Sequence, residues 1–478
     1  MPQDGTFAEA RRGTPPGRAA LSGAAPEVLW LDDTARPEPL PGLCGDARAD
    51  LLVIGGGYTG LWTALRAKER DPGRDVVLLE AGRCGDQASG RNGGFASASL
   101  THGFHNGRAR WPDELTILDE LGARNLAEIG DTVRRYGIDC RWEETGELLV
   151  ATAPHQVEEL AELSRDMRAA GHDVELLDEA GARAEVRSPT YLGALLDRTG
   201  TALLEPARLA WGLRDACLAL GVRIHERTPV RGLARDGAGL EVRTPAGVVR
   251  PAQVALATNA FPPLLRRLRL MTVPVYDYVL ATEPLSLEQR ASIGWAGRQG
   301  IGDSANLFHY YRLTRDDRIV WGGYDAVYHY GSRIGRDLEQ SDTTHGLLAE
   351  HFFATFPQLA DVRFTHRWGG VIDTCTQFSA FFGKAYDGRV AYAMGYTGLG
   401  VAATRFGADV MLDLLSGETT ERTSLRMVRE KPLPFPPEPV RYAGIQLTRR
   451  SLAQADQRGG RRNLWLRALD RMGLGFDS

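Results

Sequence analysis

The chain has 478 residues, of which 43% are hydrophobic and 25% are charged, and its formal net charge is −4. This composition is typical of a globular protein with about two or three domains, and the charge does not indicate nucleic acid as a partner. No uncharged apolar run reaches about 18 residues and residues 1–27 contain no apolar core, so the sequence predicts neither a membrane span nor a secretory signal. The five cysteines form no CxxC pair, which favours a reducing cytoplasm and argues against a disulfide framework or a metal site.

The N-terminal segment differs in composition from the rest of the chain. Residues 1–27 are rich in Gly, Pro, Ala and Arg, which predicts a flexible tail. The prolines within residues 37–41 predict an extended linker that leads into the folded body.

The most informative segment is residues 50–80. An apolar run at residues 51–54 is followed by Gly-Gly-Gly-Tyr-Thr-Gly, a helix-like stretch and a second apolar run at residues 76–79. Glu80 closes the second run. A strand–GxGxxG–helix–strand unit with an acidic residue about 20 positions after the last glycine is typical of adenine dinucleotide binding.

Each part of this unit has a physical role in binding a dinucleotide. Gly55 permits the tight turn, Gly57 lets the backbone approach the pyrophosphate, and Gly60 lets the helix pack close to the first strand. The free N–H groups at the start of the helix then face the phosphates, and we expect Glu80 to accept hydrogen bonds from the adenosine ribose.

Three later segments favour FAD over NAD as the dinucleotide. Residues 89–95, Ser-Gly-Arg-Asn-Gly-Gly-Phe, offer backbone N–H groups where the rest of a long cofactor would pass. Residues 257–260 end a strand in small side chains, which suits close approach to the nucleotide. The turn at residues 395–400 precedes an apolar helix, residues 401–415, whose positive end could face the pyrimidine edge of a flavin. An NAD-linked dehydrogenase is the alternative.

The remaining pattern alternates helices with strands rich in aromatic and β-branched residues. It predicts helices at residues 112–136, 155–171 and 206–220, a hairpin at 240–243 and 247–250, and strands at 147–151, 222–225, 254–260, 271–282, 307–313, 318–324 and 390–394. The basic, amphipathic segment 449–478 is expected to dock on the body rather than on an anionic membrane. Because cofactor-like motifs lie at both ends of the chain, a second domain is expected to be inserted into a discontinuous nucleotide domain.

Six segments together resemble a known family. GGGYTGLWTAL, VVLLEAGRCG, SGRNGGF, ATNA, YYRLTRDDRIVWGG and MGYTGLGVA are similar to segments of the D-amino-acid oxidase/glycine oxidase superfamily of FAD enzymes, over roughly residues 30–430. The SGRNGG loop and the YYRLT strand are most similar to the gamma-glutamylputrescine oxidase branch. The resemblance implies an α/β (α+β) fold, in which a glutathione reductase-like FAD-binding domain interleaves with a substrate domain built on a mixed or antiparallel sheet.

The resemblance also implies domain boundaries and cofactor contacts. We expect the FAD-binding domain at residues 45–110, 195–265 and 360–430, the substrate domain at 111–194 and 266–359, and a docking tail at 431–478. Noncovalent FAD is expected to contact Gly55, Gly57, Tyr58, Thr59, Gly60, Glu80, Ala81, Ser89, Arg91, Asn92, Gly93, Gly94, Val230, Thr258, Asn259, Gly395, Thr397, Gly398, Leu399 and Gly400.

The implied reaction is oxidation of a C–N bond by hydride transfer to flavin N5, after which the imine is hydrolysed. Glycine oxidase-like members bind the substrate carboxylate through an arginine in a W-A-G-L-R-P segment. Here Ile372 stands in the place of that arginine, and Gly398 stands in the place of a second one. A desolvated carboxylate needs such a partner, so a simple α-amino acid is disfavoured as substrate. Asp373 would suit a cationic amine, although a structural carboxylate is equally open.

Further candidate catalytic residues lie on the central aromatic strands. Sarcosine oxidase-like members use a lysine near the flavin for the reaction with oxygen; the matching strand here has none, and His309 is a possible substitute. Tyr311 could line the amine pocket, where ring faces attract cations, or it could belong to the core of the sheet. Arg312 could pair with a carboxylate on a larger substrate, such as a gamma-glutamyl group.

The sequence therefore predicts an FAD-dependent amine oxidoreductase acting on a primary or secondary amine, polyamine-like or gamma-glutamylated. The expected partners are that small-molecule amine and oxygen or another electron acceptor. Two alternatives stay open: a D-amino acid dehydrogenase that passes electrons to a quinone or other carrier, and a flavin-binding protein without turnover. Nothing in the sequence indicates the oligomeric state.

Overall fold

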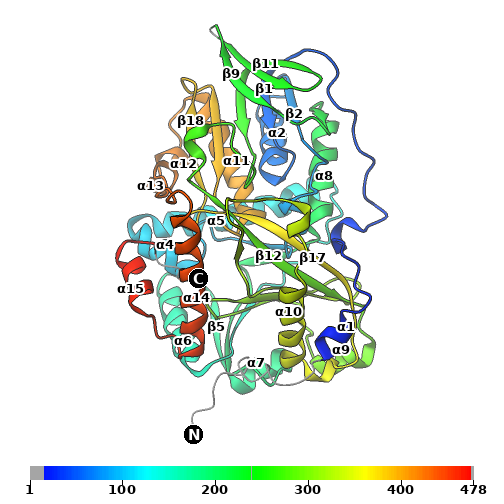
Figure 1. The fold of residues 1–478 in the computed structure, drawn as a ribbon, viewed down its shortest axis with the longest axis vertical. Helices are drawn as coiled ribbons and strands as arrows, with labels where there is room; N and C mark the ends of the chain where they lie inside the picture. The colour runs from blue at the N-terminus through cyan, green and yellow to red at the C-terminus, as the bar shows by residue number, and fades with distance from the viewer. Residues whose placement is uncertain (1–15, 238, 475–478) are drawn as a thin grey trace.

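A computed structural model describes residues 16–237 and 239–474. Two large β-sheets lie one above the other along the long axis of the molecule, with helices on their outer faces (Figure 1). This arrangement confirms the predicted α/β fold. Among the described residues, no helix combines the length and the apolar character needed to cross a membrane.

The first sheet is built around the predicted dinucleotide unit, and its main strands follow the order β18-β19-β11-β1-β2-β8. The strands are β1 (Ala47–Ile54), β2 (Val76–Leu79), β8 (Arg223–His225), β9 (Gly232–Asp236), β10 (Gly239–Thr244), β11 (Gly247–Leu256), β18 (Phe381–Ala385) and β19 (Val390–Met394). β19, β11, β1, β2 and β8 are parallel, whereas β18 pairs antiparallel with β19 and the β9–β10 hairpin joins β11 antiparallel. The predicted hairpin strand 247–250 and strand 254–260 are one continuous strand, β11.

Four helices pack around this sheet and on one another. They are α2 (Tyr58–Arg70), α5 (Leu115–Arg135), α8 (Pro206–Ala219) and α11 (Gly400–Ser416). α2 and α11 are in close contact and are joined by salt bridges: Arg70 of α2 pairs with Asp409 and Asp413 of α11, each at 2.7 Å. Both aspartates are almost fully buried, so these salt bridges are structural.

The second sheet has the order β16-β12-β15-β14-β13-β4-β6-β5, and β17 pairs with the other edge of β12. Its strands are β4 (Glu147–Ala151), β5 (Val174–Asp178), β6 (Gly193–Asp197), β12 (Val273–Thr282), β13 (Gly300–Asp303), β14 (His309–Leu313), β15 (Ile319–Gly323), β16 (Val327–Tyr328) and β17 (Phe364–Thr374). All neighbours are antiparallel except β13 and β4. Helix α10 (Asp342–Thr355) covers one face over an aromatic core that includes Tyr276, Tyr278, Tyr311, Trp321 and Phe352.

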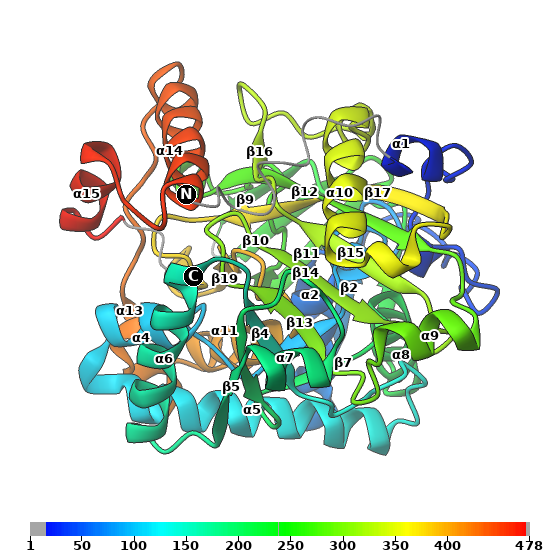
Figure 2. The ribbon, with the colours of Figure 1, turned by 90° about the horizontal axis from the view of Figure 1, so that it is seen from below.

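Short elements complete the chain. They are α1 (Pro16–Ala20), η2 (Leu29–Leu31), α3 (Ala88–Arg91), β3 (Phe95–Ser97), α4 (Phe104–Arg110), η3 (Pro112–Glu114), α6 (Pro154–Ala169), α7 (Glu179–Glu185), β7 (Thr201–Leu203), η4 (Arg266–Leu268), α9 (Leu287–Ile293), η5 (Arg336–Leu338), η6 (Pro357–Leu359), α12 (Glu421–Ser424), α13 (Arg426–Arg429), α14 (Val440–Gln457) and α15 (Leu464–Arg471). Viewed from below, α14 and α15 stand side by side at one edge, and α1 stands beside α10 at the opposite edge (Figure 2).

Two segments lie elsewhere than their predicted domains. We expected residues 360–430 in the cofactor domain, but β17 pairs along the whole of β12 in the second sheet. Residues 195–197 likewise belong to β6 of that sheet. Strand pairing across a long sequence separation leaves no local signal, which explains both differences. The rest of the predicted domain division stays a prediction.

The two ends of the chain are in contact with the body where the structure describes them. Residues 1–15 of the predicted flexible tail lie outside the described part. Within residues 16–27, Pro16–Ala20 instead form α1, which packs on α10, and Ala25 forms a β-bridge with His366. At the other end, Arg449 of α14 pairs with Asp325 at 2.6 Å, and Asp456 accepts from the amide of Asn306 at 2.6 Å.

Candidate active site

The GxGxxG turn lies between β1 and α2 and tolerates no side chain at two of its glycines. Gly55 has φ +112°, and a Cβ there would meet the Ala257 carbonyl oxygen at 2.3 Å. A Cβ on Gly60 would meet the Gly55 carbonyl oxygen at 1.8 Å. The backbone is therefore shaped for close approach, with the start of α2 aimed at the carboxyl edge of the parallel strands, where dinucleotides bind.

Side chains around the turn hold it in this shape. The Tyr58 N–H donates to Ser89 Oγ at 2.8 Å. Glu80 lies at the end of β2 beside Ala81, and its carboxylate accepts the N–H groups of Gly56 at 2.6 Å and Gly82 at 2.7 Å. Burial raises the pKa of Glu80, and the hydrogen bonds from these two N–H groups oppose the rise. This is the position from which the predicted ribose acceptor would act.

The 89–94 loop connects the two sheets. Asn92 Oδ1 accepts the Gly94 N–H at 2.9 Å, and the Trp368 indole of β17 donates to the Arg91 carbonyl at 2.9 Å. Arg91 also forms an ion pair with Glu339 at 2.7 Å. A Cβ on Gly93 would meet the Tyr310 ring of β14 at 2.5 Å. The loop thus lies directly on one face of the second sheet.

The turn before α11 is the third glycine-rich element. Gly395, Thr397 and Gly398 all have positive φ, and a Cβ on Gly398 would meet open space. No side chain caps the first turn of α11, whose N-cap is Leu399, among the described residues. The contact of these uncapped N–H groups with the electron-rich edge of a flavin stays a prediction.

The Asp373 carboxylate is committed to this turn. Asp373 is 2% exposed and accepts the Gly395 N–H at 2.5 Å. Burial raises its pKa to about 7, and the nearby backbone N–H groups oppose the rise. The carboxylate therefore orients the turn, and its contact with a substrate ammonium stays a prediction.

The remaining predicted cofactor residues follow strands of the first sheet. Thr258 and Asn259 come directly after β11, where Asn259 has φ +49°. Val230 follows β8 and packs half-buried against the core of this sheet. The structure thus brings the three glycine-rich turns and these strand ends to one side of the first sheet.

His309 and Tyr311 lie on the other face of the second sheet, toward α10. Each is 1% exposed. His309 contacts Asp303 through Nδ1 at 2.6 Å and His351 of α10 through Nε2 at 2.9 Å. The Tyr311 hydroxyl contacts that of Tyr191 at 2.6 Å, and burial raises the pKa of Tyr311. The structure does not bring these two residues together with the 89–94 loop.

Arg312 points to the loop but is fully engaged with backbone carbonyls. It is 1% exposed and donates to the carbonyls of Leu204 at 2.6 Å, Gly94 at 3.3 Å and Leu313 at 3.3 Å. Its guanidinium lies over the Trp30 ring, and burial lowers its pKa to about 10. It therefore holds the loop against the sheet.

The sequence analysis missed Asp277, the one acidic residue of β12. Its Oδ2 accepts the Tyr310 hydroxyl at 2.5 Å and its Oδ1 accepts the Tyr278 N–H at 2.9 Å. Because alternate residues of a strand point to opposite faces, Asp277 faces the 89–94 loop while its two tyrosine neighbours face α10. The sequence signal that could have identified Asp277 was a single charged residue between the two tyrosines of an otherwise largely apolar strand.

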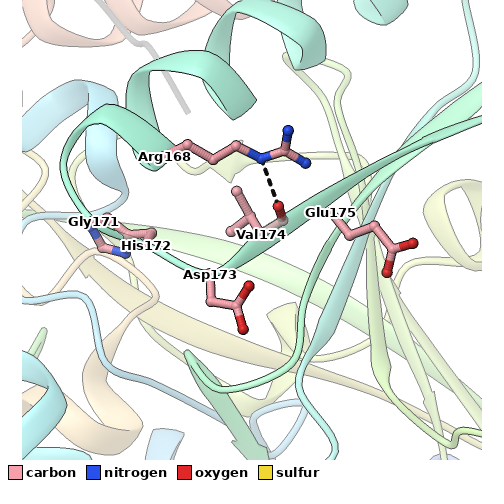
Figure 3. Close-up of a pocket in the computed structure, with 6 residues that line it drawn as sticks. All are labelled: Arg168, Gly171, His172, Asp173, Val174 and Glu175. Atoms are coloured by element: carbon pink, nitrogen blue, oxygen red, sulfur yellow. Dashed lines mark hydrogen bonds between the residues drawn. The ribbon is translucent and has the colours of Figure 1, made fainter.

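A surface hollow lies between α6 and β5, far from these turns. Figure 3 shows it lined by Arg168, Gly171, His172, Asp173, Val174 and Glu175. Arg168 donates to the Val174 carbonyl at 2.9 Å, and His172 contacts the Asp119 carboxylate at 3.0 Å. Without converging polar groups, the hollow is not an active site.

Comparison with known proteins agrees with this geometry. The DAO family model, described as FAD dependent oxidoreductase, matches residues 50–414. The chain is 33% identical over 393 residues to gamma-glutamylputrescine oxidoreductase of Escherichia coli K12, covering 80% of this chain and 88% of that protein. It is 28% identical over 408 residues to the probable oxidoreductase OrdL of Haemophilus influenzae, covering 83% and 89%.

A solved structure shows the same fold. Glycine oxidase from Geobacillus kaustophilus superposes with a TM-score of 0.66 at 19% identity, over 78% of this chain and 96% of that chain. The family match, the resemblance and the glycine-rich turns agree: the chain belongs to the DAO family of FAD-dependent oxidoreductases.

Proposed function

We propose that this oxidoreductase oxidises the C–N bond of a primary or secondary amine, either polyamine-like or gamma-glutamylated, whose reacting carbon carries no carboxylate. The observation that carries the proposal is the charge on the loop-facing side of the second sheet. Its arginine, Arg312, is committed to three carbonyls, while the Asp277 carboxylate has no cationic partner among the residues that the structure describes. β12 and β15 contain no basic residue. Such a surface favours a cation over a carboxylate.

The similarity to gamma-glutamylputrescine oxidoreductase supports the same class of substrate. That name describes an amine with a free ammonium at one end and an amide-linked glutamyl group at the other. The missing pocket arginines at Ile372 and Gly398 are consistent with such a molecule.

The residues present fit an FAD cofactor. The GxGxxG turn and Glu80 would hold the adenosine half, and the 89–94 loop and the turn before α11 would hold the flavin half. When bound, FAD supplies the hydride acceptor. The chain contributes orientation: it holds the amine, in its neutral form at the reacting nitrogen, with the C–H bond directed at the acceptor.

An anaerobic mixing experiment tests the proposal. The purified flavoprotein is mixed with putrescine, gamma-glutamylputrescine, sarcosine, glycine and D-alanine, and loss of the oxidised flavin absorbance is followed. We expect reduction by putrescine or gamma-glutamylputrescine and little by glycine or D-alanine. Fast reduction by D-alanine would favour the D-amino acid dehydrogenase, and no reduction by any amine would favour a flavin-binding protein without turnover. Peroxide release in air then identifies oxygen as the acceptor.

A further inference from the structure

Asp277 lies where the second sheet meets the 89–94 loop. The Tyr310 hydroxyl donates to Asp277, and the Tyr310 ring packs edge-on against the Phe95 ring, with 5.9 Å between the centroids. The same ring lies so close to Gly93 that it would contact a Cβ there. In the sheet, Asp277 stands opposite Gly370 of β17, so no side chain covers it from that strand. A Cβ on Gly370 would meet the Arg91 Cβ at 3.6 Å, so the backbone beside the carboxylate is bordered by the predicted cofactor loop.

The Asp277 carboxylate is partly buried, and no lysine, arginine or histidine pairs with it in the part of the chain that the structure describes. Some other buried carboxylates have a basic partner, whereas Asp373 and Glu80 accept backbone N–H groups. Asp409 pairs with Arg70 at 2.7 Å, and Asp303 pairs with His309 at 2.6 Å. A desolvated carboxylate without a cation is unfavourable, and proteins retain such groups where a ligand supplies the opposite charge.

We infer that Asp277 is the residue that recognises a cationic nitrogen of the substrate other than the one that is oxidised, and that Tyr310 is a positioning residue that fixes the Asp277 carboxylate. This inference rests on the proposed function. The tyrosine hydroxyl engages Oδ2 and the Tyr278 N–H engages Oδ1, so the carboxylate has one orientation and keeps lone pairs for an ammonium. No side chain of β17 stands beside the carboxylate at Gly370, and Arg91, which borders this backbone, is paired with Glu339 at 2.7 Å.

A pair of nearly isosteric probes tests the charge preference without turnover. tert-Butylammonium has no hydrogen on the carbon beside nitrogen and cannot be oxidised, and pivalate is its anionic counterpart. Each is titrated into the FAD-loaded enzyme while the flavin absorbance is followed. We expect the wild-type enzyme to bind tert-butylammonium more tightly than pivalate. Asp277→Asn should weaken the binding of tert-butylammonium on the order of tenfold or more, because a charged hydrogen bond is lost.

Three variants complete the design. Asp277→Glu keeps the charge and should retain more affinity than Asp277→Asn. Tyr310→Phe should weaken binding less than Asp277→Asn, because the carboxylate remains. Asp316→Asn removes a largely exposed carboxylate in the turn between β14 and β15 and should match the wild type. FAD content and melting temperature are measured for each variant, so that loss of the fold is separated from loss of binding.

Equal affinity of wild type and Asp277→Asn for tert-butylammonium, with normal FAD content, would overturn the inference. The two proposals fail separately. If amines reduce the flavin equally well in wild type and Asp277→Asn, the proposed function stands and the role of Asp277 is wrong. If the probe binds through Asp277 but no amine reduces the flavin, the role of Asp277 stands and the proposed function is wrong.

The dependence of probe binding on pH is a second readout. Burial raises the pKa of Asp277 to about 6, and the Tyr310 hydroxyl and the N–H groups of Tyr278 and Gly323 oppose the rise. Charged residues nearby are Asp325, which is paired with Arg449, and Arg91, which borders Gly370 opposite Asp277 and is paired with Glu339. Below pH 6 the carboxylate takes up a proton, so wild-type affinity for tert-butylammonium should fall as the pH falls through about 6. Asp277→Asn should show no such step; a step of the same size in the variant would contradict the assignment.

Discussion

At the scale of single residues, Arg312 shows how a polar residue in a strand can be structural. The guanidinium bridges the carbonyls of Gly94 and Leu204, which belong to separate segments on the same side of the sheet. Arg312→Ala would remove the Arg312 hydrogen bond to the Leu204 carbonyl and leave the Gly94 carbonyl with the Leu204 N–H alone, so we expect a loss of about 1–3 kcal/mol in the free energy of unfolding. Denaturant unfolding and FAD content measure this effect. Normal stability together with weaker binding of gamma-glutamylputrescine but not putrescine would instead place Arg312 in the substrate pocket.

Asp373 makes a separate prediction with a definite sign in pH. Its pKa is raised from 3.8 to about 7, so the folded state holds the proton more tightly than the unfolded state. The stability that this proton adds is present below about pH 4 and is lost as the pH rises through about 7. The unfolding free energy of wild type minus that of Asp373→Asn should therefore decrease across this range. A difference that is constant with pH would show that the carboxylate is not held as the structure has it.

The same variant separates the two roles considered for Asp373. If the carboxylate orients the turn before α11, Asp373→Asn should leave the affinity for tert-butylammonium unchanged, unlike Asp277→Asn. If it binds the ammonium, the two variants should behave alike. The comparison is direct because both substitutions remove one charge and keep the shape of the side chain.

At the scale of elements, the unit β1–turn–α2 could be predicted from sequence because its requirements are local. The contact between Gly60 and Gly55 lies within six residues of chain, and only glycine satisfies it. Gly60→Ala should therefore abolish FAD binding or folding, which FAD content of the purified protein reports. Gly73→Ala, in the turn before β2, is the matched control, since its Cβ would meet only Asp71 Oδ1 at 3.4 Å. A Gly60→Ala protein with wild-type FAD affinity would contradict the assigned geometry.

The site on the second sheet could be predicted only in part, because the face of a strand depends on distant pairing. His309, Tyr310, Tyr311 and Arg312 are consecutive, and the sequence does not say which two face the cofactor side. Contacts with Gly93 and Gly94 on one side and with His351 on the other decide it. Asp277 was overlooked for the same reason: its partner Tyr310 lies 33 residues away.

At the scale of the whole molecule, the 89–94 loop connects the glycine-rich turns of the first, parallel sheet to one face of the second sheet. The parallel sheet supplies glycine-rich turns at its carboxyl edge, and the second sheet supplies Asp277 and Tyr310. Neither sheet alone carries both sets of residues.

The central claim is that this flavoprotein oxidises an amine and rejects the same amine carrying an α-carboxylate. Anaerobic stopped-flow reduction by putrescine, compared with D-ornithine, tests it most directly, because the two molecules differ by one carboxylate. We predict that putrescine reduces the flavin at least about tenfold faster at equal, subsaturating concentration, since a carboxylate would face Asp277 without a free arginine. Faster reduction by D-ornithine would contradict the account.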